Sequence, residues 1–214
     1  MVAEAPQGFE GGHVQATHPG RGQMKMGKEY LRFDEIEDVL SSLDLLALVT
    51  PLLKKHPSYW KWAIIVAHAG LQGAMVCALR DTSGVSVLEK KCARQMLEWL
   101  ETQKGNPPKE KLADFETLLS RSTKAANMDG QPLKLTDRQT KDITRLHRHF
   151  RNDFAHFVPK SWSIEKAGLP RIVRVAVDAT DVLMHNERVD RNLSGNRKRR
   201  LAHQLKTIRE GLTR

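Results

Sequence analysis

The chain has 214 residues, of which 40% are hydrophobic and 28% are charged. This composition excludes a chain that is disordered throughout and is sufficient for one hydrophobic core. Lys and Arg number 35 against 25 Asp and Glu, a formal net charge of +10 that favours phosphate-bearing partners. Cys77 and Cys92 are too few for a disulfide framework, so we expect both to be reduced thiols.

The positive charge is concentrated near the C-terminus. Residues 1–144 carry 19 basic and 18 acidic side chains, whereas residues 145–214 carry 16 and 7. This imbalance indicates that the last third of the chain faces a polyanion such as RNA. The alternative is a solvated basic tail that binds nothing.

The first segment, residues 1–27, is rich in glycine and polar residues, and we expect a disordered tail there. It has no basic stretch followed by an apolar one, so we expect no secretory signal and a cytoplasmic protein. The apolar segment Tyr59 to Leu79 is long enough to cross a bilayer. Because Lys61, His68 and Gln72 interrupt it, we expect a central buried helix and no membrane association rather than a membrane span.

Apolar residues recur at helical spacing along nearly the whole chain, and no alternating pattern predicts a sheet. We therefore expect an all-α bundle of six or seven helices, with a helical domain at residues 28–190 and a basic C-terminal helix or tail at residues 191–214. Besides the apolar helix, the expected helices cover residues 30–43, 88–103, 111–125, 136–157, 171–186 and 196–212.

Several apolar side chains are assigned to the core by this spacing. They are Tyr30 and Phe33 in the first helix, Leu97 and Leu100 in the third, and the indoles Trp60, Trp62 and Trp99. Trp162 either covers the core or stacks on a nucleic-acid base. His68 and Gln72, one turn apart, either form a buried hydrogen-bonded pair or line a cleft.

The helix from Thr136 to about Phe157 carries two different stripes. Thr136 is a plausible N-cap with Gln139 at the capping-box position. The apolar stripe, which should face the core, consists of Ile143, Leu146, Phe150, Phe154 and Phe157. The second stripe is cationic and capable of proton transfer, and consists of Arg145, His149, Asn152 and His156.

This second stripe is a poor metal site. His149 and His156 are seven residues apart, roughly 10 Å along a helix, which is too far for both to bind one ion. We therefore expect no metal and no cofactor. A purely structural role for His156, in packing or hydrogen bonding, is the alternative to catalysis.

The six residues RNDFAH at positions 151–156 resemble the signature of the HEPN superfamily: an arginine, a polar residue, three further residues and a histidine. The longer segment RNDFAHFVPKSWSIEKAGLP is similar to a bacterial HEPN-like subgroup in which the motif is followed by Pro, Trp and a Gly-Leu-Pro turn. The upstream segment WKWAIIVAHAGLQGAMVCAL resembles a helix of the same subgroup. The resemblance covers roughly residues 28–186.

The resemblance implies a helical bundle that forms a homodimer, with the arginine and histidine of both subunits meeting in a cleft at the interface. It implies a metal-independent endoribonuclease, often a toxin or defence component, with an antitoxin or a neighbouring gene's product as a possible partner. Other members are inactive or only bind nucleotides. The rival hypotheses are therefore a catalytically silent module that binds RNA or nucleotide, and a helical scaffold or interaction protein.

The residues of the motif suit RNA cleavage by attack of the 2′-hydroxyl. His156 can act as base or acid, and its mate in the second subunit can supply the other function. Arg151 can clamp the phosphate and hold the developing charge, while Asn152 orients the phosphate or a ribose hydroxyl. Because Arg151 and His156 are about 140° apart on an ideal helix, a composite site is expected.

Further cations are candidates for contacts to the RNA backbone. Arg145 and His149 lie on the His156 face upstream, and Lys160 follows the helix. The run Arg197, Lys198, Arg199 and Arg200 could grip phosphates without reading sequence. A solvated helix face is the alternative for this run.

Overall fold

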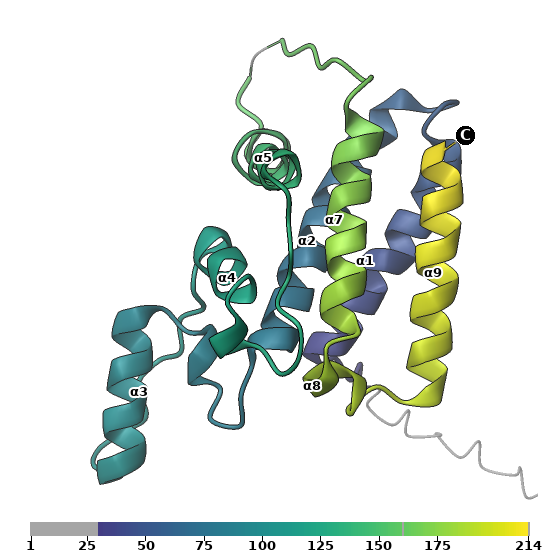
Figure 1. Ribbon diagram of the computed structural model, residues 1–214. Coiled ribbons are helices and arrows are strands. Elements are labelled where there is room, and N and C mark those ends of the chain that lie inside the picture. The colour runs from purple at the N-terminus through teal and green to yellow at the C-terminus, as the bar shows by residue number, and fades with distance from the viewer. Residues whose placement is uncertain (1–29, 160, 214) are drawn as a thin grey trace, which may run out of the picture. The chain divides into compact units, whose positions relative to one another are not determined.

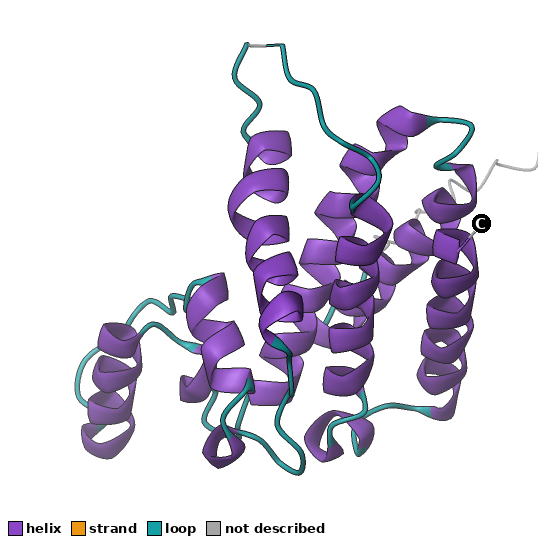
Figure 2. Ribbon diagram, turned by 45° about the horizontal axis from the view of Figure 1, so that its top comes forward, coloured by secondary structure: helices purple, strands orange, loops and turns teal. Residues whose placement is uncertain are grey.

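The structure is a computed structural model that describes residues 30–159 and 161–213. It is 69% helix, and Figure 2 shows helices and loops but no strand in these residues. The predicted all-α fold is confirmed. The tail predicted at residues 1–27 lies outside the described residues. The chain divides into two units, Met1–Arg32 and Phe33–Arg214, and the second is the helical bundle described below.

The helices of the bundle are joined by loops of different lengths, some of which contain single helical turns. They are α1 (Glu35–Val49), α2 (Trp60–Leu79), α3 (Lys90–Thr102), α4 (Phe115–Ser122), α5 (Asp137–Arg145), α6 (Asn152–Ala155), α7 (Leu169–Met184), α8 (Glu187–Asp190) and α9 (Gly195–Thr213). A π-helical segment, Leu146–Arg151, joins α5 to α6 without a break. With α5 to α6 taken as one helix, the described residues contain seven helices of eight or more residues and the single turn α8.

The core of the bundle is built around α2, which packs against α1, α4 and α7 (Figure 1). Fourteen of its twenty residues are buried. By length and composition alone, the segment Pro57–Leu79 could also cross a membrane. Two thirds of its most apolar stretch is buried within the bundle, as in a core helix.

The helix starts follow local capping chemistry. The side chain of Asp34 accepts a hydrogen bond from the Glu37 backbone N–H at 2.7 Å and thereby caps α1. Thr136 and Gln139 form the predicted capping box at the start of α5. These caps satisfy backbone N–H groups that have no partner inside the helix.

The basic C-terminal helix α9 is part of the bundle. It packs along α1 and α7 (Figure 1) and buries Leu201, Leu205 and Ile208 against them. Residues 33–214 therefore form one compact unit, and the predicted boundary at residue 190 does not separate two bodies.

Several predicted core positions are exposed. Tyr30 and Phe33 precede α1, where no helix directs them inward. Leu97 and Leu100 are exposed because α3 lies beside the bundle rather than inside it (Figure 1). Trp62 is 48% exposed, whereas Trp60 is buried as predicted. Trp99 is partly buried and donates its indole N–H to the Gly105 carbonyl at 3.2 Å.

Candidate functional site

The predicted motif lies where the helix passes through the π-helical segment. In this segment one turn contains more residues than in an α-helix, which changes the directions of the following side chains. Ile143, Leu146 and Phe150 are buried as predicted. The helix ends at Ala155, two residues before the predicted end, and Phe157 is therefore exposed rather than in the core.

Arg151 and Asn152 form a hydrogen-bonded pair. Arg151 donates from Nη1 to Asn152 Oδ1 over 2.9 Å, and both side chains are partly buried. Within residues 30–159 and 161–213, no carboxylate lies at ion-pair distance from Arg151. The guanidinium therefore keeps donors available for an anion.

His156 follows the last residue of the helix and is exposed. Its backbone N–H donates to the Asn152 carbonyl at 2.9 Å, which keeps the two residues close along the chain. Its side chain does not line the cleft to which Arg151 contributes. One subunit therefore does not bring the predicted base and the predicted phosphate clamp into one cleft.

Arg145 and His149 lie together on the exposed surface, as their spacing predicts. They line a shallow hollow of about 310 Å³ with Thr140, Lys141 and Thr144. The Arg145 guanidinium also lies 5.0 Å from the centre of the Phe150 ring, in a cation–π contact.

The site contains a histidine pair that the sequence reasoning missed. His68 Nε2 and His147 Nδ1 are 2.9 Å apart, and both rings stack on Phe115 with centre-to-centre distances of 4.5 and 4.4 Å. The signal for His147 was its position four residues before Arg151, since residues at that spacing share a helix face. For His68 the sequence predicts either a pair with Gln72 or a place in a cleft, and neither expectation includes His147.

Both histidines are held neutral by their surroundings. Burial, together with the nearby His147 and Arg151, lowers the pKa of His68 to about 3. Burial also lowers the pKa of His147, although the neighbouring Glu116 carboxylate opposes that shift. The pair is thus a neutral hydrogen-bonded unit at pH 7.

A cleft of about 510 Å³ lies between α1 and α2, with Arg151 at its edge. His68 and Gln72 both line it, so the two residues face one cleft rather than form a hydrogen-bonded pair. Acidic side chains from the start of α1 line the same cleft: Asp34, Glu35 and Asp38. Its apolar wall comes from Phe33, Ile65, Ala69, Val76 and Leu112.

Trp162 is partly buried and packs on Phe154, with 4.7 Å between ring centres. This position is the core-covering one of its two predicted roles. The neighbouring candidate Lys160 lies outside the described residues.

Most cations of the basic run in α9 have acidic partners. Arg197 Nη2 is 2.8 Å from Asp34 Oδ2, and Lys198 Nζ is 2.7 Å from Asp190 Oδ1. Arg200 Nη1 lies 2.7 Å from Glu37 Oε1, and the same guanidinium contacts Asp44. Arg199 donates to the side chain of Asn196. These contacts give the run a structural role, and its RNA-binding role stays a prediction.

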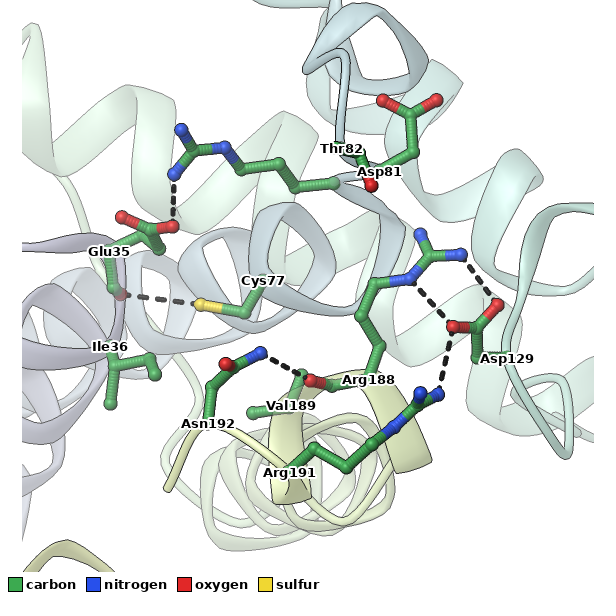
Figure 3. Close-up of a pocket in the computed structure, with 11 residues that line it drawn as sticks. Glu35, Ile36, Cys77, Asp81, Thr82, Asp129, Arg188, Val189, Arg191 and Asn192 are labelled. Atoms are coloured by element: carbon green, nitrogen blue, oxygen red, sulfur yellow. Dashed lines mark hydrogen bonds and ion pairs between the residues drawn. The ribbon is translucent and has the colours of Figure 1, made fainter. Parts of the chain in front are cut away.

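A cavity of about 610 Å³ is separate from the motif. Its arginines pair with carboxylates: Figure 3 shows Arg188 and Arg191 beside Asp129, and Arg80 forms an ion pair with Glu35. Cys77 at its wall bonds the Glu35 carbonyl, and burial raises the pKa of its thiol to about 12. The cavity therefore holds paired charges and an unreactive thiol.

Within the described part of the chain, no three His, Cys, Asp or Glu side chains are grouped closely enough to hold a metal ion. No model of a known protein family, no curated protein and no solved structure matches this chain.

Proposed function

We propose that the protein is a metal-independent endoribonuclease of the HEPN type that acts as a homodimer. The observation that carries this proposal is the arrangement at the end of one helix. Arg151, which has no carboxylate partner among the described residues, is hydrogen-bonded to Asn152 one turn before an exposed histidine, His156. These are the residue types needed to hold a phosphate and move a proton.

In the proposed reaction, a phosphate of RNA binds the free donors of Arg151. The 2′-hydroxyl loses its proton to one histidine and attacks the adjacent phosphorus, and the 5′-oxygen leaves with a proton from a second histidine. The products are a 2′,3′-cyclic phosphate and a free 5′-hydroxyl. Arg151 stabilises the charge that develops on the phosphate oxygens. Because the nucleophile is the 2′-hydroxyl, DNA is not a substrate.

The second histidine comes from the second subunit in this proposal. His156 is exposed and lies outside the cleft of Arg151 in its own chain. A composite site at the dimer interface would place the His156 side chains of both chains beside a phosphate that Arg151 holds. This arrangement gives the proposed reaction both an acid and a base.

The surface beside the motif supports a path for the RNA backbone. Arg145 and His149 are exposed on the same helical run. Among the residues that the structure describes, no carboxylate forms an ion pair with Arg145. Contacts of this kind position RNA without reading its sequence. A cytoplasmic location stays a prediction, as does the antitoxin or neighbouring-gene partner that the resemblance implies.

A second candidate function is a non-catalytic module that binds RNA or a nucleotide. The observation that favours it is the cleft of about 510 Å³ beside Arg151, which has the size of a small-molecule site. In such a module Arg151 would bind phosphate and His156 would have no chemical task.

The variant His156→Ala separates the two candidates. The nuclease proposal predicts that it loses cleavage of labelled RNA by at least 100-fold while its RNA affinity changes less than threefold, because general acid–base catalysis typically contributes about 10²–10⁴-fold. His203→Ala, at an exposed histidine of α9, is the matched control and should retain cleavage. Equal activity of wild type and His156→Ala would contradict the nuclease proposal.

A further inference from the structure

The cleft between α1 and α2 contains two polar side chains without partners. Asp34 pairs with Arg197, and Glu35 pairs with Arg80. In contrast, the Asp38 carboxylate and the Gln72 amide make no side-chain hydrogen bond or ion pair with any residue that the structure describes. Asp38 is an exposed residue at the cleft, and desolvation of its carboxyl raises the pKa, as expected for a carboxylate without compensating donors.

The apolar side chains of the cleft suit a flat ring. Ile65 and Val76 of α2 are partly buried along the cleft. Phe33 and Leu112 are 56% and 41% exposed, although both are large and apolar. A planar heterocycle inserted here would cover them and stack on Phe33.

We propose that this cleft binds a guanine base whose phosphate is held by Arg151. The inference rests on the proposed function, because it identifies the cleft as the base-binding part of the same site. Guanine presents two adjacent donors, N1–H and the N2 amine, to a carboxylate that can accept both, and the Gln72 amide can donate to O6. Adenine, cytosine and uracil offer no such pair of adjacent donors on one edge.

The charges and size of the cleft agree with this assignment. Arg151 supplies the positive charge of the cleft lining, and the acidic side chains come from the segment at the start of α1. A guanine nucleotide would thus place its phosphate at the cation and its donor edge at the carboxylate. The volume of about 510 Å³ is sufficient for a mononucleotide.

Calorimetric titration of the full chain with GMP, IMP and AMP tests the proposal. GMP should bind at least tenfold more tightly than AMP, with IMP, which lacks the N2 amine, between them. Asp38→Asn and Gln72→Ala should each weaken GMP at least fivefold while changing AMP less than twofold. Gln95→Ala, at an exposed position on α3, is the control and should change neither.

The outcomes separate this inference from the nuclease proposal. RNA cleavage without preference for guanosine, together with equal binding of GMP and AMP, would overturn the guanine site and leave the nuclease intact. GMP selectivity that depends on Asp38, in a protein that cleaves no RNA, would support the guanine site and contradict the nuclease. Thermal unfolding of each variant shows whether the variant is still folded. If Asp38→Asn is not folded, Asp38→Glu, which moves the carboxylate outward, replaces it.

Discussion

His68 and His147 form a neutral pair, of which His68 is buried and His147 is partly buried. His68 has a pKa of about 3 in the folded protein, against 6.5 for an unperturbed histidine. Below pH 6.5 the unfolded chain binds a proton that the folded chain does not, so stability falls as the pH falls from 6.5 towards 3.

We therefore expect the free energy of unfolding to drop by about 2 kcal/mol between pH 8 and pH 5 on account of His68. The variant His68→Gln removes the titration but keeps a hydrogen-bonding side chain, and its stability should vary less over this range. Urea unfolding at pH 8, 6 and 5 measures both proteins. A wild type and a variant with the same pH dependence would contradict the assignment.

At the scale of elements, the contact between α1 and α2 depends on small residues of α2. A methyl group on Gly73 would lie 2.8 Å from Val39 Cγ2 and 3.0 Å from Asp38 Oδ2, both on α1. At Gly70 the nearest atom would be Ser42 Cβ at 3.6 Å, an ordinary contact distance. The two glycines thus differ in how closely the neighbouring helix approaches.

Gly73→Ala should destabilise the protein by about 1–3 kcal/mol, because the buried Val39 must move. Gly70→Ala should be neutral or stabilise by up to about 1 kcal/mol, since alanine favours the helix. Denaturant unfolding of the two variants provides the comparison. Equal effects would mean that α1 and α2 do not approach as described.

The contact between α9 and α1 gives a second prediction at this scale. Arg200 pairs with Glu37 and Asp44, whereas Arg199 contacts only Asn196 of its own helix. Arg200→Ala should lower the free energy of unfolding by about 0.5–1 kcal/mol, because the pair is partly exposed. Arg199→Ala should change it by less than about 0.3 kcal/mol.

Thermal or urea unfolding at low salt measures this difference. If Arg200→Ala leaves stability unchanged but weakens RNA binding, the basic run binds nucleic acid and does not stabilise the bundle.

The helices themselves were predictable because their signals are local. The Thr136 and Gln139 capping box and the Pro51 and Pro57 breaks mark boundaries within a few residues. Burial was less predictable because it depends on neighbours. Leu97 has helical spacing, yet α3 lies beside the bundle, so no partner covers it.

The directions of the motif side chains were less predictable still. The π-helical segment changes the turn between Arg145 and Arg151, and an ideal period of 3.6 residues cannot represent it. The pairing of His68 with His147 joins residues 79 positions apart, so no local pattern contains it. The residue types of the site were available from sequence, but their grouping required the fold.

At the scale of the whole molecule, the proposed catalytic site requires two chains. Arg151 and His156 do not share a cleft within one subunit, and the proposed acid and base are the His156 side chains of two subunits, so the complete site forms only across an interface. Size-exclusion chromatography with light scattering at micromolar concentration should give a mass near twice the 24.3 kDa of one chain. A mass of one chain at every concentration tested would contradict the composite site.

The most direct test of the central claim is cleavage of labelled total RNA by the purified protein in EDTA, beside the double variant Arg151→Ala, His156→Ala. We predict that the wild type cleaves RNA in the chelator, leaves 2′,3′-cyclic phosphate ends, and that the double variant does not cleave. No cleavage by the wild type, or equal cleavage by the double variant, would contradict a metal-independent nuclease built on this helix.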